Sequence, residues 1–328
     1  MRNDLHIHMI LEGAGFRAAI DRHRKSPDDS VIRGRLAAYR DCGVTFLRDG
    51  GDAWGVCIRA KQLAPEYGID YRMPAFPIHR IGHYGGFIGR GYNDLKEYAS
   101  LVREADNAGA DFIKVMISGL MDFGCYGKLS EDSLPADEIR EIIHIAHDKG
   151  LAVMAHCNGT SATIAACEAG VDSIEHGGYL EDEALCALAE TGCVWVPTIS
   201  AVSNLTGSGR FPDEELEMIV SFTRGNVRKA ADLGVVIGCG SDAGASRVRH
   251  PDSALMSGSV DPNEQVKQTK DAPGVQVSSL AEDSRMLRSA LVGAQTEEAL
   301  LREALGDAAD GILDHAEELV KRCFQRQS

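Results

Sequence analysis

The feature that most constrains the fold is a glycine that stands between the end of each helical segment and the start of the next apolar one. The pattern reads DCG-V, NAG-A, DKG-L, EAG-V, ETG-C and DLG-V along the chain. Glycine just past the last helical turn is a typical helix terminator, and the apolar run after it is typical of a buried strand. The repetition predicts a chain in which strands and helices alternate, with a mainly parallel sheet.

Short apolar segments predict eight strands, with helical patterns between them. The predicted strands are 3–8, 43–49, 70–78, 110–118, 151–157, 171–176, 193–199 and 234–242. The predicted helices lie near 31–41, 53–66, 93–108, 135–149, 159–169, 181–191 and 213–233. Eight strands with intervening helices favour a (β/α)8 TIM barrel of the α/β class. A doubly wound open sheet is the competing fold, and periodicity alone does not exclude it.

The size of the chain suits one such barrel. With 328 residues and 44% hydrophobic content, it can bury a large core. We expect a single domain over 1–328, with its core at 3–250. The segment 251–279 follows as a long loop or lid, rich in Ser, Asp, Gly and Pro, and helical patterns fill much of 280–328.

Charge and composition exclude several classes of partner. The formal net charge of −15 disfavours nucleic acid and anionic membranes. No apolar run is long enough to span a bilayer, and no secretory signal opens the sequence. Nine cysteines without a C-x-x-C pair fit a reduced, cytoplasmic protein. The expected partner is a small-molecule substrate, and a homo-oligomer remains open.

Two histidines stand at the end of the first predicted strand. Strict alternation places His6 and His8 on the barrel interior and Leu5 and Ile7 on the opposite face. Because the C-terminal ends of barrel strands carry the chemistry, this H-x-H pair is a candidate for metal binding.

Three further strands end in residues of the same kind. His156 is in phase with the inward Met154, His176 is in phase with Ile174, and Asp242 follows two glycines that leave room beneath it. Imidazole and carboxylate are ligands that catalytic zinc takes.

Lys114 is predicted to point into the barrel from the middle of the fourth strand. The β-branched Ile113, Val115 and Ile117 suit the face that packs on helices, which leaves Lys114 inside. A buried ammonium is costly unless its charge is removed or paired. One interpretation is a lysine that extends to the rim. The other is a lysine of lowered pKa that reacts with CO2, giving a carbamate able to bridge two metal ions.

The arrangement of these strand ends, and the text around them, resembles the amidohydrolase superfamily. The segments AGADFIKVMISG, AHDKGLAVMAHCNG, EAGVDSIEHGGYLEDEA, VWVPTIS and GVVIGCGSDAG are similar to the branch that holds imidazolonepropionase and the Xaa-Pro dipeptidase (prolidase)-like hydrolases. The resemblance covers residues 3–245. It implies a binuclear site, most simply of two Zn2+ ions, with a carboxylated Lys114 as bridge and Asp242 also as general base. The implied ligands are His6, His8, Lys114, His156, His176 and Asp242.

The sequence departs from the family pattern at both ends. Few residues precede the H-x-H, and the glycine-rich tail that closes a flanking β-sandwich is missing. We therefore expect a barrel without the usual sandwich domain. The departure leaves the substrate class more open than the metal site.

The expected reaction is hydrolysis of a C–N amide bond by metal-activated water. His83 is the candidate donor to the scissile carbonyl. Loops rich in arginine suggest a substrate that bears a carboxylate, such as an N-acyl amino acid, a dipeptide or a lactam acid. The candidate binding residues are Arg80, His83, Tyr84, Arg247 and Arg249. Solvated arginines, or arginines paired with neighbouring acids, are the alternative.

Two other functions stay open. The first is a mononuclear deaminase or cyclic-amide hydrolase of the same superfamily, in which Lys114 would not bind metal. The second is a metal-binding protein without catalysis.

Overall fold

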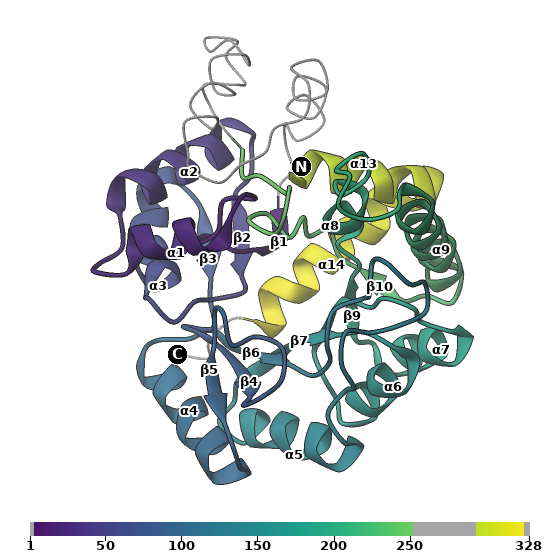
Figure 1. Cartoon of the computed structure of the whole chain (residues 1–328), viewed down its shortest axis with the longest axis horizontal. Helices are drawn as coiled ribbons and strands as arrows, with labels where there is room; N and C mark the ends of the chain where they lie inside the picture. The colour runs from purple at the N-terminus through teal and green to yellow at the C-terminus, as the bar shows by residue number, and fades with distance from the viewer. Residues whose placement is uncertain (1–2, 252–292, 325–328) are drawn as a thin grey trace.

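Short strands form the centre of the molecule and helices surround them (Figure 1). We describe the protein from a computed structural model, over residues 3–251 and 293–324. The strands are β1 (Asn3–Ile7), β2 (Phe46–Asp49), β3 (Asp70–Arg72), β4 (Pro77–Arg80), β5 (Arg90–Tyr92), β6 (Phe112–Met116), β7 (Ala152–Cys157), β8 (Ser173–His176), β9 (Val194–Val196) and β10 (Val236–Ile237).

The strands lie in two parallel sheets that hydrogen bonds connect. One sheet has the order β1-β2-β3 and the other β10-β9-β8-β7-β6-β4-β5. The amide of Leu5 donates to the Cys239 carbonyl at 2.9 Å, which joins β1 to the segment after β10. On the other side, the Asp111 amide donates to the Met73 carbonyl at 2.9 Å. The predicted α/β fold of the TIM-barrel type is confirmed, and the described residues contain no flanking β-sandwich.

The helices follow the strands in alternation, as the glycine pattern predicts. Each of the six terminator glycines has a positive φ, between 67° and 83°, a conformation that glycine adopts without steric cost. The helices are α1 (Phe16–His23), α2 (Asp29–Asp41), α3 (Val56–Leu63), the 3-10 helix η1 (Ala64–Tyr67), α4 (Leu95–Asn107), α5 (Ala136–His147), α6 (Thr160–Glu168), α7 (Asp182–Thr191), α8 (Ile199–Ser203), α9 (Asp213–Asp232), α13 (Gly293–Leu305), the 3-10 helix η2 (Gly306–Ala308) and α14 (Ala309–Cys323).

Two apolar layers lie on either side of the strands. The outer layer holds Ile113, Val115 and Ile117, which are buried in the large core cluster that the strands share with the helices. The inner layer, which we call the barrel floor, consists of buried side chains from the strands, from α14 and from Phe324 directly after it. It holds Leu5, Phe46, Phe112, Met154, Val194, Val196, Val320 and Phe324. In Figure 1 α14 passes across the middle of the ring of strands, which closes the barrel at this end.

The structure differs from the prediction in one divided strand and three unpredicted elements. The predicted strand 70–78 is divided into β3 and β4, and Ala75 between them has a φ of 64°. The short helices α1 and α8 and the short strand β5 were not predicted.

Within the described residues no helix is long and apolar enough to cross a membrane. The predicted loop 251–279, apart from its first residue, and almost all of the predicted helix 280–293 lie outside the described residues.

An irregularity in β1 changes which of its side chains face the interior. Asp4 pairs with Leu47 and Ile7 with Asp49, so β1 advances three residues while β2 advances two. The extra residue forms a β-bulge, a feature that redirects side chains. Leu5 therefore joins the barrel floor while its neighbour His6 also faces inward, and the prediction that Leu5 lies on the outer face was wrong.

Candidate metal centre

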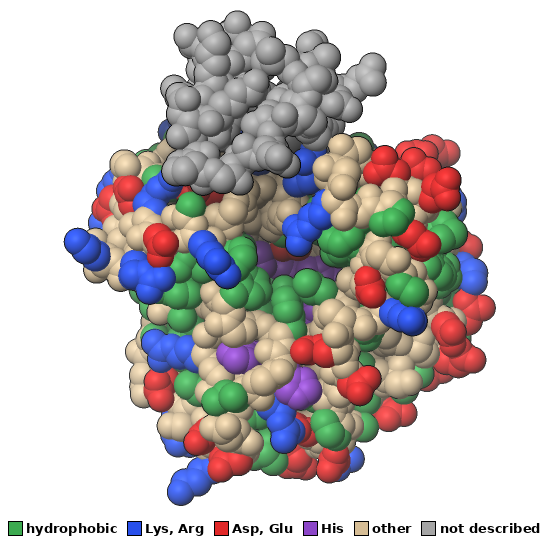
Figure 2. All heavy atoms as spheres, in the orientation of Figure 1, with side chains coloured by type: hydrophobic (Ala, Val, Ile, Leu, Met, Phe, Trp, Pro, Cys, Tyr) green, Lys and Arg blue, Asp and Glu red, His purple; other side chains and the backbone are tan. Residues whose placement is uncertain are grey.

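The side chains predicted at the strand ends lie together at the C-terminal end of the barrel. The rings of His6 and His8 are 5.3 Å apart, those of His6 and His176 5.0 Å, and those of His156 and His176 4.6 Å. Figure 2 shows histidines recessed at the centre of this face. Three strands that are separated in sequence, β1, β7 and β8, thus bring their imidazoles into one cluster.

Asp242 completes a group that could hold one metal ion. Its Oδ1 lies 3.3 Å from His8 Nε2 and 3.6 Å from His6 Nε2. One nitrogen of each histidine and one carboxylate oxygen lie within 4.8 Å of one another. Asp242 has a φ of 58°, and such strained backbone in a non-glycine residue is concentrated at functional sites.

Two glycines leave the space that the histidines occupy. A Cβ at Gly50 would lie 2.4 Å from Cε1 of His8, and a Cβ at Gly240 would lie 2.8 Å from Cβ of His6. Real Cβ atoms do not approach so closely, so any side chain at either position would displace a histidine. The expected room beneath Asp242 is present, and His6 and Leu5 fill it.

His156 and His176 are each oriented by a second hydrogen bond. His176 Nδ1 lies 2.7 Å from the Thr198 hydroxyl, and His156 Nε2 lies 3.2 Å from the Gly119 carbonyl. Such contacts fix the ring and leave the other nitrogen for a ligand. His176 is not in phase with Ile174 as predicted. Ile174 lies in the outer core, and His176 reaches the cluster because its φ of 69° turns the chain at the strand end.

Lys114 is buried in the barrel interior and pairs in register with Met154, two residues before His156. Its Nζ has no hydrogen-bond partner among the described residues. Burial lowers the pKa of this amine to about 8. The ammonium is thus easier to neutralise than an ordinary lysine.

Three histidines of the cluster, His6, His156 and His176, are held in their neutral form by lowered pKa values. Burial, followed by the positive charge of neighbouring groups, lowers the pKa of His156 to about 3 and that of His6 and His176 well below the usual value. A neutral imidazole has the free lone pair that a metal ligand needs. Burial therefore supports the metal-binding form of these side chains.

Sequence reasoning missed the groups that orient His6. Its Nδ1 lies 2.7 Å from Glu175, and Glu175 also contacts Arg48 and Ser173. Alternation within β8 could have revealed Glu175. Ser173 and Glu175 share the inner face of this strand if His176 is not assumed to point inward together with Ile174.

The loop after β4 brings Tyr84 rather than His83 against the cluster. The Tyr84 ring lies 4.8 Å from the His156 ring. His83 is 34% exposed, and its Nδ1 lies 3.8 Å from Glu131. Tyr84 also begins a row of aromatic rings that continues through Phe87 to the exposed Phe16, with centroid separations of 5.8 and 5.5 Å.

The two arginines that flank this loop, Arg80 at the end of β4 and Arg90 at the start of β5, are paired with acids from elsewhere in the chain. Arg80 contacts Glu138 of α5, and Arg90 lies 3.0 Å from Glu104 of α4. An arginine without acidic neighbours in the sequence can therefore still be paired with an acid in the folded protein. Arg247 donates from Nε to the Asn204 carbonyl at 2.9 Å, and the aliphatic part of Arg249 lies against Gly13.

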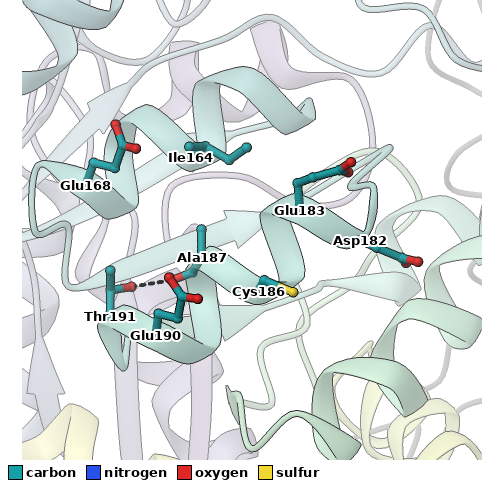
Figure 3. Close-up of a pocket in the computed structure, with 8 residues that line it drawn as sticks. All are labelled: Ile164, Glu168, Asp182, Glu183, Cys186, Ala187, Glu190 and Thr191. Carbon is teal, nitrogen blue, oxygen red and sulfur yellow. Dashed lines mark hydrogen bonds between the residues drawn. The ribbon is translucent and has the colours of Figure 1, made fainter.

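A groove of about 450 Å³ lies elsewhere, between α6 and α7 (Figure 3). Its lining includes Glu168, Glu183 and Glu190, and none of its lining residues belongs to the histidine cluster. This groove is separate from the candidate metal centre.

Comparison with known proteins agrees with this geometry. The sequence model of the Amidohydrolase family matches residues 55–276. The uncharacterised protein Mb2939c of Mycobacterium bovis is 34% identical over 251 residues, which cover 72% of this chain and 64% of that protein. Ochratoxinase of Aspergillus niger is 28% identical over 276 residues, which cover 74% of this chain and 56% of the enzyme.

A solved structure shows the same fold. A Xaa-Pro dipeptidase with bound methionine in its active site superposes with a TM-score of 0.64 at 20% identity, over 97% of this chain and 74% of that one. The present chain spans less than two thirds of the length of the curated relatives it matches. The family match covers most of the chain, and the chain belongs to the amidohydrolase family, with the fold of its prolidase-like members.

Proposed function

We propose that the protein is a metal-dependent hydrolase that cleaves a C–N amide bond with water. The observation that carries this proposal is the approach of His6, His8 and Asp242 to one another at the C-terminal end of the barrel. This end holds the active site in barrel enzymes. Ochratoxinase and the Xaa-Pro dipeptidase support the proposal as relatives of the family.

The residues of the cluster fit a metal centre. His6 Nε2 and His8 Nδ1 are buried without a hydrogen-bond partner in the described structure, as is Lys114 Nζ. Buried polar atoms are rarely left unpaired, so these atoms indicate a missing ligand. We propose two zinc ions, held by His6, His8, Lys114, His156, His176 and Asp242. The ions would supply Lewis acidity, which makes water nucleophilic near neutral pH and polarises a carbonyl.

Lys114 would act as a carbamate. The ammonium would first lose one proton. The neutral amine would then attack CO2, so that a C–N bond forms, one C=O π bond opens onto oxygen and a second proton leaves, which gives an anionic oxygen ligand. The lowered pKa of Lys114 increases the fraction of neutral amine at pH 7. The product would also remove the unpaired positive charge from the barrel interior.

Asp242 would be the general base. Its carboxylate is partly accessible, with 11% of the side chain exposed, and lies beside both histidines of β1. It would take the proton of the attacking water and pass it to the amine that leaves. His83 remains the predicted donor to the carbonyl. Tyr84 is the residue of the same loop that packs against His156, and its hydroxyl is a second candidate for that role.

We propose an amide substrate with a carboxylate and an apolar group, such as an N-acyl amino acid, a dipeptide or a lactam acid. The row from Tyr84 to Phe16 supports the apolar group. Arg247 and Arg249 remain candidates for the carboxylate, whereas Arg80 is already paired with Glu138.

A mononuclear hydrolase of cyclic amides or a deaminase is the second candidate. One observation favours it: the atoms that lie within ligand distance of one another come from His6, His8 and Asp242 alone among the described residues. Lys114 would then remain an amine.

Metal content and activity together test the proposal. Protein produced with zinc and bicarbonate should contain about two zinc ions per chain by elemental analysis, and about one would favour the mononuclear enzyme. A panel of N-acyl amino acids, dipeptides and lactam acids should reveal activity, and Asp242→Asn should lower kcat by about 10²–10⁴-fold. Fully loaded protein without activity on any amide, ester or lactone would contradict the proposal.

A further inference from the structure

We infer that Glu175, held in place by Arg48, is a positioning residue that orients His6 toward the metal centre before any metal binds. The inference rests on the proposed function, because it requires that His6 be a metal ligand. It goes further, since it assigns a role to two buried residues that are not among the proposed ligands. A pre-oriented ligand loses less freedom when the ion binds, so this pair would raise metal affinity.

The hydrogen bond between Glu175 and His6 fixes both the tautomer and the ring. Glu175 Oε2 lies 2.7 Å from His6 Nδ1, and both side chains are 0% exposed. A carboxylate can only accept, so Nδ1–H is the donor. The lone pair of His6 is then on Nε2, the atom that lies 3.6 Å from Asp242 and has no other partner in the described structure.

Arg48 and Ser173 hold the carboxylate that orients His6. Glu175 Oε1 accepts from Arg48 Nη2 and from the Ser173 hydroxyl, both at 2.6 Å. Arg48 Nη1 also donates to the Ser173 oxygen at 2.9 Å. Both oxygens of the carboxylate are therefore bound in a fixed direction, and Glu175 cannot rotate away from His6 without breaking these bonds.

Arg48 also fixes the backbone that carries His6. Its Nε donates to the Leu5 carbonyl at 2.7 Å, at the β-bulge where β1 has one residue more than β2. A bulge leaves ladder groups without their usual partner, and the guanidinium supplies one here. The same side chain thus holds the His6 backbone at the bulge and, through Glu175, the His6 ring.

A purely structural role does not account for this arrangement. A buried ion pair is seldom more stabilising than apolar side chains of similar volume, because both charges lose their hydration. The surrounding barrel floor shows that apolar packing is available at this depth, since Arg48 itself lies 4.7 Å from the Phe324 ring. What the pair adds is direction, and that direction points His6 Nε2 at Asp242.

Zinc affinity tests the inference without a substrate. In competition with a chromophoric chelator, the full-length Glu175→Gln protein should bind zinc about 10- to 100-fold more weakly than wild type, as is typical when a partner of a ligating histidine is lost. Ser173→Ala removes one hydrogen bond to Glu175 and one from Arg48, but Arg48 and Glu175 remain paired with each other, so it should fold. It should weaken zinc binding by about 3- to 10-fold.

Asp111→Asn is the matched control. Asp111 is also a buried acid paired with a cation, Lys61 at 2.7 Å, but it lies at the start of β6. This variant should lose stability and keep the zinc affinity of wild type. The 15N resonances of His6 in the zinc-free protein give a second readout: the proton should reside on Nδ1 in wild type, and Glu175→Gln should lose this preference.

The outcomes separate this inference from the proposed function. Wild-type protein that binds no zinc would overturn both. Zinc bound equally tightly by wild type, Glu175→Gln and Ser173→Ala would overturn the positioning role alone. If Glu175→Gln does not fold, unchanged zinc affinity in Ser173→Ala has the same meaning.

Discussion

The barrel floor and the histidine cluster share the strands β1 and β7, yet one is apolar and the other polar. At the floor, Phe112 packs edge to face on Phe324 of the segment after α14, with ring centroids 5.2 Å apart. Two residues further along β6, Lys114 ends in a buried amine without a partner in the described structure. The first inward residue of β6 thus stabilises the fold, and the second is available for chemistry. The apolar packing of the floor offsets the unfavourable burial of polar groups at the other end of the barrel.

The largest expected effect tests the floor. Phe112→Ala removes a fully buried ring and should lower the free energy of unfolding by about 3–5 kcal/mol, measured by urea denaturation. The zinc content of the folded protein should not change, because the proposed ligands lie at the other end of the barrel. A variant that kept its stability but lost zinc would contradict this division between the two ends.

A smaller effect should appear as a change in the free energy of unfolding with pH. Glu297 of α13 accepts a hydrogen bond from the Ser200 amide of α8, and burial raises the pKa of Glu297 to about 7 from 4.5. Because the folded pKa is the higher one, its contribution to stability is complete below pH 4.5 and is lost as pH rises through 7. Wild type should therefore lose about 2–3 kcal/mol more than Glu297→Gln between pH 5 and pH 8.

Denaturation of the two proteins at a series of pH values measures this difference. Other buried acids titrate in both proteins, so the difference isolates Glu297. If the free energies of unfolding of the two proteins changed in parallel with pH, the pKa of Glu297 in the folded protein would not be raised.

The smallest effect has the opposite sign. Lys114→Met removes the unpaired amine and should raise the free energy of unfolding of the zinc-free protein by about 1–3 kcal/mol, while binuclear zinc binding is lost. Phe112→Ala and Lys114→Met would then change the stability in opposite directions, although both residues lie on one face of β6. Lower stability in zinc-free Lys114→Met would indicate that the lysine makes contacts that stabilise the fold.

Local pattern predicted the positions of the strands well. The glycine terminators and apolar runs are local signals, so each predicted strand has a counterpart and Lys114 faces inward between residues of the outer core. Side-chain direction failed where the backbone left regular strand geometry. The bulge turned Leu5 inward, and the positive φ of His176 brought it to the cluster out of register. Periodicity assumes a regular strand and cannot show either.

Partners from distant parts of the chain were the other source of error. Arg80 stands in an acid-free loop, but α5 supplies Glu138 to pair with it. Arg48 was not recognised because nothing near it in sequence indicates that β8 will place Glu175 beside it. Such contacts depend on how the strands are arranged around the barrel, and that arrangement follows from the whole fold.

The joining of β1 to the last strands and to α14 has a consequence for the order of folding. The amide of Leu5 needs the carbonyl of Cys239, and the side chain of Asn3 contacts Glu317 of α14. During synthesis, β1 must wait for segments made more than two hundred residues after it. Its histidines and apolar side chains stay exposed for that time. We expect the nascent chain to depend on slow release from the ribosome or on chaperone protection more than a chain whose fold is built from local contacts.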